Sequence, residues 1–330
     1  MTDVLLVSLG STAGLRAADA ELAGAIERAG ATVAVVAARA PREVRTLALT
    51  DLVWARAARV AAQAGITEHR PRSVLYGTVT AALLWPRPGA IRYDAPASAN
   101  RPGRHGVWQR PLERRRLGKA TLLVPQTQGT LEESPAPRAE AVVVPIPVEP
   151  SGPPEPTRDF AALTYAADPQ KKGLDLVLAA WARVRRPGEE LVVAGIAAGR
   201  VPRREGVRAA GRLPPEAYRD LLRRARVYVT APRREDYGLA QLEALADGTL
   251  LVTTPAPGPY AALPLARELD HRLVTDDLPT ALRTALDDPA PGYAERALEA
   301  LAPYRRAAID ETVARELLPR LLGGAGGGAG

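Results

Sequence analysis

Two glutamates, Glu235 and Glu243, stand eight residues apart in the second half of the chain, and Gly238 lies between them. β-Branched runs at 225–230 and 250–254 predict buried strands on either side, and leucines at helical spacing predict a helix between the strands. Glu235 then lies at the carboxyl end of a strand and Glu243 just over one turn into the helix. The amides of a helix start favour anions, and a glycine lets a ligand approach them. The pattern therefore indicates an anion site beside two carboxylates, although surface acids on a Rossmann-type helix would give the same spacing.

The residues from Glu235 to Gly248 resemble the Glu-x7-Glu signature of retaining GT-B glycosyltransferases of family 4, the glycosyl transferases group 1. The family pattern is Glu-x-Phe-Gly-Leu-x-x-x-Glu-Ala-x-Ala-x-Gly, and a tyrosine replaces the phenylalanine here. The resemblance implies that Glu243 accepts hydrogen bonds from the ribose of a nucleotide sugar. It implies a catalytic role for Glu235, which would contact the sugar hydroxyls and position the donor. The residues that would also line the donor site are Tyr237, Gly238 and Leu239.

A second segment, 168–173, resembles the Gly-Arg-x-x-x-x-Lys-Gly segment that holds the donor diphosphate in this family. Lys172-Gly173 matches its Lys-Gly. The resemblance implies that Lys172, with the helix amides after Tyr237, offsets the charge of the leaving diphosphate. The Gly-Arg pair falls on Ala166-Ala167, so the family arginine is missing, and Lys171 is a candidate substitute.

The first half of the chain begins like a Rossmann domain, with an apolar strand, a loop containing glycines, a helix and a second strand at 4–9, 10–14, 17–29 and 32–36. It is not a dinucleotide fingerprint, because the Gly-x-Gly-x-x-Gly spacing is absent and no acid follows the second strand. In family 4 the first loop lies against donor and acceptor. Gly10 and Ser11 match that loop by position only, and a tight turn explains them equally well.

A polar loop follows the predicted strand at 90–94, at a place where open α/β sheets present functional groups. The family resemblance assigns the acceptor to this half, which makes Asp94 and His105 the acceptor-side candidates. An ordinary surface role explains His105 as well. The basic helix expected at 107–117 suits contact with an anionic acceptor or a membrane surface, or a plain solvated face.

Composition excludes several classes of function. The chain has no cysteine, which excludes disulfides, thiolate zinc sites and cysteine nucleophiles. Its three histidines are far apart in sequence, and the adjacent acids Asp276-Asp277 and Asp287-Asp288 do not fit the Asp-x-Asp spacing of metal-dependent glycosyltransferases. We therefore expect no metal and no cofactor. The net charge of +7 comes without a zinc finger, RRM or helix-turn-helix signature, so no nucleic acid partner is expected.

We predict an α/β protein of the GT-B fold, with two Rossmann-like domains facing across a cleft. Residues 1–147 form the acceptor-side domain, and the proline-rich stretch 148–158 forms a linker. Residues 159–322 form the nucleotide-sugar domain, with terminal helices that pack back. The last residues, 323–330, are only glycine and alanine and are expected to be disordered.

The resemblance implies an enzyme that transfers a sugar from a nucleotide-diphosphate sugar to an acceptor hydroxyl, with retention of configuration and without metal. Its partners would be the nucleotide sugar and a glycan, lipid or small-molecule acceptor, and its location the cytoplasm, with peripheral contact at the inner membrane face. Two alternatives stay open. The missing arginine favours a degenerate module that binds a sugar or an anionic polymer without catalysis, whereas the intact glutamates disfavour it. A nucleotide-dependent epimerase of the same fold would need no acceptor.

Overall fold

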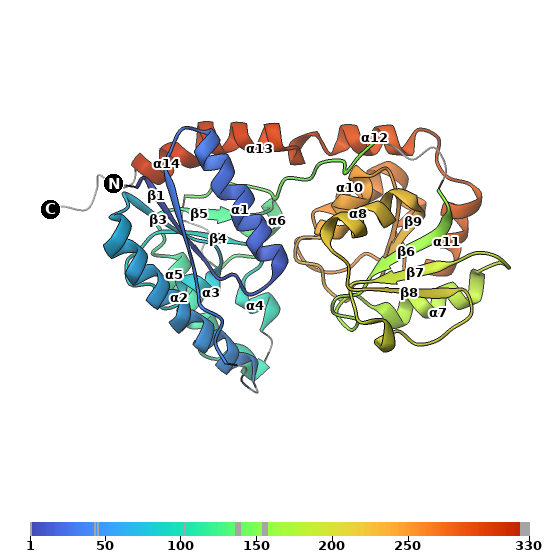
Figure 1. Ribbon diagram of the computed structural model, residues 1–330, viewed down its shortest axis with the longest axis horizontal. Helices are drawn as coiled ribbons and strands as arrows, with labels where there is room; N and C mark the ends of the chain where they lie inside the picture. Colours follow the sequence, from blue (N-terminus) through green and yellow to red (C-terminus); the bar gives the residue numbers. More distant parts are fainter. Residues whose placement is uncertain are drawn as a thin grey trace. The chain divides into compact units, whose positions relative to one another are not determined.

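The structure is a computed structural model that describes residues 2–42, 44, 46–101, 103–135, 140–153 and 158–323. It divides into two compact units (Figure 1). Unit 1 consists of Met1–Pro147 together with Arg306–Gly330, and unit 2 consists of Val148–Arg305. The glycine and alanine tail from 324 onward lies outside the described residues.

Unit 1 is built on five parallel strands in the order β2-β1-β3-β4-β5. The strands are β1 (Val4–Ser8), β2 (Val33–Ala37), β3 (Ser73–Tyr76), β4 (Ala90–Tyr93) and β5 (Leu123–Pro125). β1 is central, and Val4 is paired with Val33 on one side and with Ser73 on the other. All five residues of β1 are buried, as expected for a parallel strand with both faces covered.

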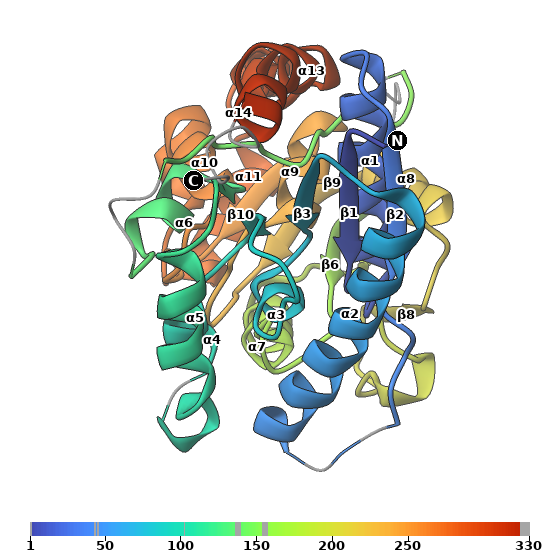
Figure 2. The ribbon, with the colours of Figure 1, turned by 90° about the vertical axis from the view of Figure 1, so that its left-hand side faces the viewer.

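Helices cover both faces of this sheet (Figures 1 and 2). One face packs against α2 (Leu47–His69), α3 (Val79–Ala82) and α5 (Gln109–Leu117), and Leu5 and Val7 point to it. The other face packs against α1 (Ala13–Arg28), and Val4 and Leu6 point to it. The remaining helical segments before the proline-rich stretch are α4 (Ala97–Asn100), η1 (Gly103–Gly106) and α6 (Gln128–Glu132).

The C-terminal helices belong to the α1 side of unit 1. They are α13 (Arg306–Thr312), a π-helical turn (Val313–Leu317) and α14 (Leu318–Gly323). Ile309, Val313 and Leu317 are buried in the same cluster as Val4 and Leu6. Arg28 of α1 also donates two hydrogen bonds of 2.7 Å to Asp310. The sequence assigned these residues to a segment of the second domain that packs back, and the structure places everything from Arg306 onward in unit 1.

Unit 2 contains a second parallel sheet, in the order β10-β9-β6-β7-β8. Its strands are β6 (Phe160–Tyr165), β7 (Leu191–Ala194), β8 (Val207–Gly211), β9 (Ala225–Thr230) and β10 (Leu250–Thr253). Its helices are α7 (Leu174–Val184), α8 (Pro215–Arg224), α9 (Leu239–Ala246), α10 (Ala262–Asp270), α11 (Leu278–Asp287) and α12 (Tyr293–Ala300). α7 packs against α11, whereas α8 and α12 both contact α9.

Three short turns complete unit 2, namely η2 (Ala198–Arg200), η3 (His271–Leu273) and η4 (Ala302–Tyr304). Residues 272–274 do not form a strand. The chain forms the 3₁₀ turn η3 there, because the Asp270 carboxylate caps it through the Arg272 amide, and only Val274 makes a bridge, to Thr253.

Each sheet has a switch point, where the direction in which successive strands are added reverses. It lies between β1 and β3 in unit 1 and between β6 and β9 in unit 2. Open α/β sheets bind ligands at such points, just beyond the carboxyl ends of the strands. These two sheet edges are therefore where functional side chains are expected.

Candidate active site

The two predicted catalytic residues meet at the switch point of unit 2. Lys172 lies in the loop after β6 and Glu235 in the loop after β9, with Lys172 Nζ 2.5 Å from Glu235 Oε2. The side chains are only 19% and 6% exposed. Gln241 of α9 donates a second hydrogen bond to the same oxygen, at 3.0 Å. The carboxylate of Glu235 is thus fixed by one cation and one amide.

A second ion pair lies beside the first. Lys171 Nζ is 2.7 Å from Asp236 Oδ2, and Arg234 Nε is 2.8 Å from the other oxygen of Asp236. The Arg233 amide donates to the Lys171 carbonyl at 2.9 Å, which joins the two loops through their backbones. Sequence reasoning missed Asp236, which nothing in the signature distinguishes from a surface acid.

Gly173 brings the start of α7 against the end of β9. Its φ is 63°, and a Cβ atom there would lie 1.9 Å from the carbonyl oxygen of Ala231. Only glycine fits such an approach in this backbone conformation. Because Lys172 precedes Gly173, this close packing also fixes where the Lys172 side chain starts.

The start of α9 is shaped in a similar way. Gly238 caps the helix with a φ of 87°, and a Cβ atom there would lie 2.8 Å from the ring of Tyr260. Tyr237 is buried, and its carbonyl accepts a hydrogen bond from the Ala261 amide. Leu239 is the first residue of α9. The three predicted donor-site residues therefore form the turn into this helix, whose first amides have no intrahelical acceptor.

The loop after β10 lies against the same turn. The Glu235 amide donates to the Pro257 carbonyl at 3.0 Å, and a Cβ atom on Gly258 would meet the Glu235 carbonyl oxygen at 2.3 Å. The loops after the two neighbouring parallel strands β9 and β10 therefore lie at the same edge of the sheet.

Glu243 lies one turn further along α9, in different surroundings from Glu235. Its nearest cation is Arg219, with Nη1 3.8 Å from Oε1, and its side chain is 23% exposed. Burial raises the pKa of Glu243 to about 7, while Arg219 opposes the shift. The Glu235 carboxylate is paired with the adjacent Lys172 ammonium group. Glu243 instead lies 3.8 Å from Arg219, and its pKa is near neutrality.

Sequence reasoning missed the aromatic neighbours of Glu243. Tyr165 ends β6, and its ring centroid lies 5.0 Å from that of Tyr218. Burial raises the pKa of the Tyr165 hydroxyl, Glu243 raises it further, and Arg212 lowers it. Arg212 is an exposed guanidinium directly after β8.

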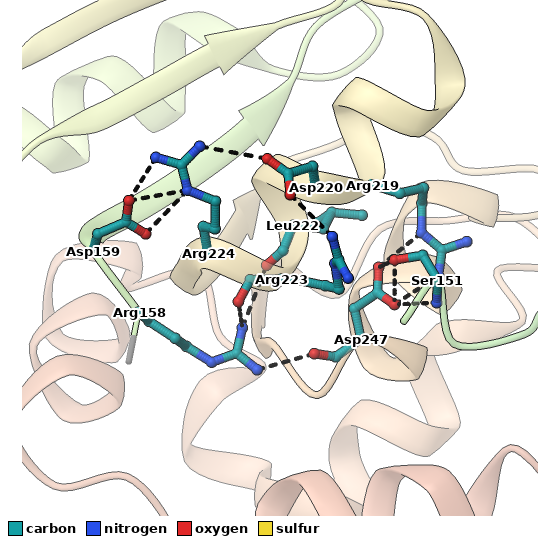
Figure 3. Close-up of polar contacts among 9 residues, drawn as sticks. All are labelled: Ser151, Arg158, Asp159, Arg219, Asp220, Leu222, Arg223, Arg224 and Asp247. Carbon is teal, nitrogen blue, oxygen red and sulfur yellow. Dashed lines mark hydrogen bonds and ion pairs between the residues drawn. The ribbon is translucent and has the colours of Figure 1, made fainter. Parts of the chain in front are cut away.

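Within unit 2, residues 149–151 of the proline-rich stretch are held by Arg219 and by Asp247, which caps the end of α9 (Figure 3). The fully buried Asp247 carboxylate accepts from Arg219 Nε at 2.8 Å and from the Ser151 amide at 2.8 Å. Arg219 also donates to the carbonyl of Glu149. Arg158 donates to backbone carbonyls of Leu222, Arg223, Ala225 and Asp247. Arg219 thus links the stretch at 149–151 to Glu243.

The candidates from the first half lie in unit 1. Ser11 and Asp94 both line a cavity of about 380 Å³ at the carboxyl ends of β1, β3 and β4. Gly10 precedes Ser11, and its carbonyl accepts from Arg16 at 2.7 Å. His105 lies in η1, and its side chain is outside the described part of the structure. Gly10 and Ser11 therefore belong to unit 1, whereas the other proposed donor-site residues belong to unit 2.

The cavity also contains polar side chains that sequence reasoning missed. Gln109 and Glu113 of α5 are both 1% exposed, and Asp51 of α2 is 6% exposed. Arg101 forms a two-pronged ion pair with Asp51, at 2.7 and 3.0 Å. The basic helix expected at 107–117 corresponds to α5, which buries Gln109 and Glu113 in unit 1. One of its arginines, Arg116, lies over the ring of Trp85 at 5.1 Å.

Comparison with known proteins finds a family model and solved structures that resemble this chain. Residues 160–288 match the family model of glycosyl transferases group 1. WaaG, a glycosyltransferase involved in lipopolysaccharide biosynthesis, superposes with a TM-score of 0.71 at 15% identity, over 97% of this chain and 99% of that chain. Sucrose-phosphate synthase from Thermosynechococcus elongatus gives 0.71 at 15% identity, over 95% and 97%. The trehalose-6-phosphate protein from E. coli, solved with UDP-2-fluoro glucose, gives 0.68 at 12% identity, over 96% and 99%.

The chain has the GT-B fold, and residues 160–288 of its second unit resemble the group 1 glycosyl transferases. The predicted α/β fold class is confirmed. Family 4 membership and retention of configuration stay predictions. No curated protein sequence gives a significant match.

None of the helices in the described part of the chain is both long enough and apolar enough to span a bilayer. No group of three or more histidine, aspartate or glutamate side chains there is placed to hold a metal ion.

Proposed function

We propose that this protein transfers a sugar from a nucleotide-diphosphate sugar to an acceptor hydroxyl, with retention of configuration. The observation that carries the proposal is the pair Lys172–Glu235, held at the switch point of a sheet that matches the group 1 glycosyl transferases. The same loops present the starts of α7 and α9, whose amides favour an anion.

Each charged group has a role in this reaction. Lys172 and the first amides of α9 stabilise the charge that develops on the departing diphosphate. Glu235 contacts the sugar hydroxyls, and its pairing with Lys172 and Gln241 holds its carboxylate in one position. Glu243 accepts hydrogen bonds from the ribose. Lys171, which is held by its ion pair with Asp236, adds positive charge near the diphosphate.

We further propose that transfer needs no divalent metal, because protein groups supply the positive charge. Turnover should then continue with a chelator present. Activity that disappears with chelator and returns with magnesium or manganese would contradict this part of the proposal.

The test of the main proposal is a binding panel followed by turnover. Nucleoside diphosphates with different bases, and their sugar derivatives, are screened by thermal shift. A ligand present at a hundredfold its dissociation constant stabilises the folded state by roughly 2.7 kcal/mol. The donor found in this way is then incubated with acceptors, and NMR of the first product reports the anomeric configuration. Inversion of configuration would overturn the retaining mechanism, and failure of every nucleotide to bind would overturn the proposal.

One observation favours a second candidate, a module that binds a sugar or an anionic polymer without catalysis. The family arginine falls on Ala166-Ala167, and Ala166 is buried. Lys171 is engaged by Asp236. Stabilisation by a nucleotide sugar without turnover, across neutral, aminated and phosphorylated acceptors, would support this candidate over the enzyme.

A further inference from the structure

Arg219 of α8 is held in one orientation by its hydrogen bonds within unit 2. Its Nε and Nη2 donate to the two oxygens of Asp247, at 2.8 and 2.9 Å (Figure 3). Nη2 also donates to the Glu149 carbonyl at 2.8 Å. The Asp247 side chain is fully buried, and that of Arg219 is 15% exposed. Two of the three guanidinium nitrogens are therefore fixed, and their contacts determine where the third nitrogen points.

The third nitrogen of Arg219 faces Glu243. Nη1 makes no hydrogen bond to a described residue, and it lies 3.8 Å from Glu243 Oε1. At this distance the two groups attract each other by charge without forming a hydrogen bond. The Glu243 carboxylate makes no hydrogen bond to a described residue either, so its lone pairs are available to a ligand. Lys172, by contrast, uses a lone pair of Glu235 directly.

Glu243 is desolvated but still reachable, because its side chain is 23% exposed. Burial raises the pKa of Glu243 to about 7, Arg219 lowers it and Asp247 raises it further. The other titratable groups that face it come from three elements, and they are Tyr165 of β6, Tyr218 of α8 and Tyr228 of β9. Arg219 is therefore the cation that favours the charged form of this carboxylate.

Asp247 lies where a carboxylate does not stabilise its own helix. It caps the C-terminal end of α9, and the negative end of the helix dipole disfavours an acid there. Burial of the carboxylate also costs free energy unless a cation and hydrogen bonds compensate for it. Arg219 supplies the cation, and Ser151 adds hydrogen bonds from its amide at 2.8 Å and its hydroxyl at 3.0 Å. What the placement of Asp247 achieves is to fix Arg219 beside Glu243.

We propose that Arg219 is a positioning residue of the donor site, which keeps Glu243 charged and leaves both of its oxygens free to accept hydrogen bonds. Asp247 and the Glu149 carbonyl hold the guanidinium at a distance where it attracts Glu243 without bonding to it. The role of Glu243 toward the donor ribose rests on the proposed function. The effect of Arg219 on the charge of Glu243 stands on the geometry of unit 2.

The first measurement follows the charge of Glu243 in the full chain without any ligand. Isotope-labelled glutamate carboxyl groups are titrated by NMR, and the resonance that disappears in Glu243→Gln identifies Glu243. Arg219→Met should raise the pKa of Glu243, because the attracting cation is lost. Asp247→Asn should lower it, because the repelling charge is lost while Arg219 remains. An unchanged or lowered pKa in Arg219→Met would overturn the proposal.

A double variant keeps this test valid if Arg219→Met alone fails to fold. The single change leaves the buried Asp247 carboxylate without its cation, which is strongly destabilising. Arg219→Met combined with Asp247→Asn leaves no such charge. The pKa of Glu243 in the double variant should exceed its value in Asp247→Asn, and equal values would refute the assignment.

The second measurement is the affinity for the nucleotide sugar between pH 6 and pH 9, by calorimetry. Wild-type affinity should rise with pH as Glu243 loses its proton. Arg219→Met should bind about fivefold more weakly at pH 7 and recover most of this loss at pH 9, where the carboxylate is charged again. The KM for the donor should rise more than kcat falls. A loss of the same size at every pH would show a purely structural role for Arg219 and would overturn the proposal.

Arg223→Met is the matched control. Arg223 lies on the same helix, its side chain is 19% exposed, and its acid partner is Asp220 at 2.9 Å. This variant should change neither the pKa of Glu243 nor the pH dependence of binding, and effects equal to those of Arg219→Met would refute the assignment. Failure of every nucleotide to bind would reject the proposed function and leave the NMR titration to decide on Arg219. Nucleotide binding with an unchanged titration of Glu243 in Arg219→Met would reject the inference and keep the proposed function.

Discussion

The switch points of the two sheets hold polar clusters of opposite character. In unit 2 the two carboxylates Glu235 and Asp236 are paired with three cations, Lys172, Lys171 and Arg234. In unit 1 acids outnumber cations among the described lining residues, and a cavity of about 380 Å³ remains between them. The surplus of positive charge in the unit 2 cluster suits an anionic ligand such as the proposed diphosphate. The described lining residues of the unit 1 pocket carry no such surplus.

The largest expected effect comes from changing the backbone that positions the unit 2 cluster. Gly173→Ala should lower the free energy of unfolding by about 3–5 kcal/mol, because left-handed strain adds to a clash with the Ala231 carbonyl. Gly188→Ala is the matched control, since its φ is also positive, at 86°, and nothing lies within 4 Å of its Cβ position. It should cost about 1 kcal/mol. Equal losses in urea denaturation of the two variants would show that the close approach at Gly173 is unimportant.

The unit 2 cluster is tested chemically by removing its central cation. Lys172→Ala should slow turnover about a hundredfold, because losing one charged contact to the leaving group costs ~3 kcal/mol of barrier. Gln241 still donates to Glu235 in this variant. The free energy of unfolding should therefore fall by less than the activation barrier rises. Lys171→Ala serves as the matched variant, because Lys171 is 39% exposed against 19% for Lys172, and it should have the smaller effect. Unchanged turnover of Lys172→Ala would remove Lys172 from the mechanism.

The two clusters also differ in how far they could be predicted from sequence. The residues of the unit 2 cluster lie in two short contiguous segments. Each segment follows a strand that could be predicted from a run of apolar residues. That both segments lie at one edge of the sheet follows from parallel strands, because the carboxyl ends of such strands share one edge. The direct pairing of Lys172 with Glu235 did not follow, because it requires β6 and β9 to be neighbours and the order of the strands depends on which faces pack in three dimensions.

The unit 1 pocket could not be predicted in the same way. Asp51, Arg101 and Gln109 come from three separate helical or loop segments, and only tertiary packing brings them together. In sequence, Gln109 and Glu113 belong to an arginine-rich helix. Polar residues four apart on such a helix are typical of a solvated face, so the sequence did not mark them as buried. Similarly, the periodic apolar residues of α13 and α14 predict a buried face without naming the sheet that covers it.

The acidity of the unit 1 pocket has a consequence for stability. Burial raises the pKa of Glu113 to about 7, from an ordinary value of 4.5. The folded state therefore binds this proton more tightly than the unfolded state does, and the resulting stabilisation is complete below pH 4.5 and lost as the pH rises through 7. Relative to wild type, Glu113→Gln should gain on the order of 3 kcal/mol between pH 5 and pH 8.

The measurement is a pair of urea denaturation curves at each pH. Glu243 also has a raised pKa, but it is present in both proteins and cancels in the difference. Glu132→Gln, an exposed change in the same unit, is the control. A pH-independent difference for Glu113→Gln would mean that this carboxyl group is not held in a desolvated site.

The smallest expected effect distinguishes the two glutamates of unit 2. Glu243 lies 3.8 Å from Arg219 and beside Tyr165 and Tyr218, and the proposed function assigns it the ribose hydroxyls. Glu243→Ala should weaken donor binding by about 1–3 kcal/mol and leave the fold intact, because a buried ligand hydroxyl loses its acceptor. Glu216→Ala, an exposed change on α8, is the control. Calorimetry with the nucleotide sugar, and with its diphosphate alone, should show the same loss for both ligands, since the ribose is common to them. A Glu243→Ala protein that binds both ligands as tightly as wild type would show that the carboxylate does not contact the nucleotide.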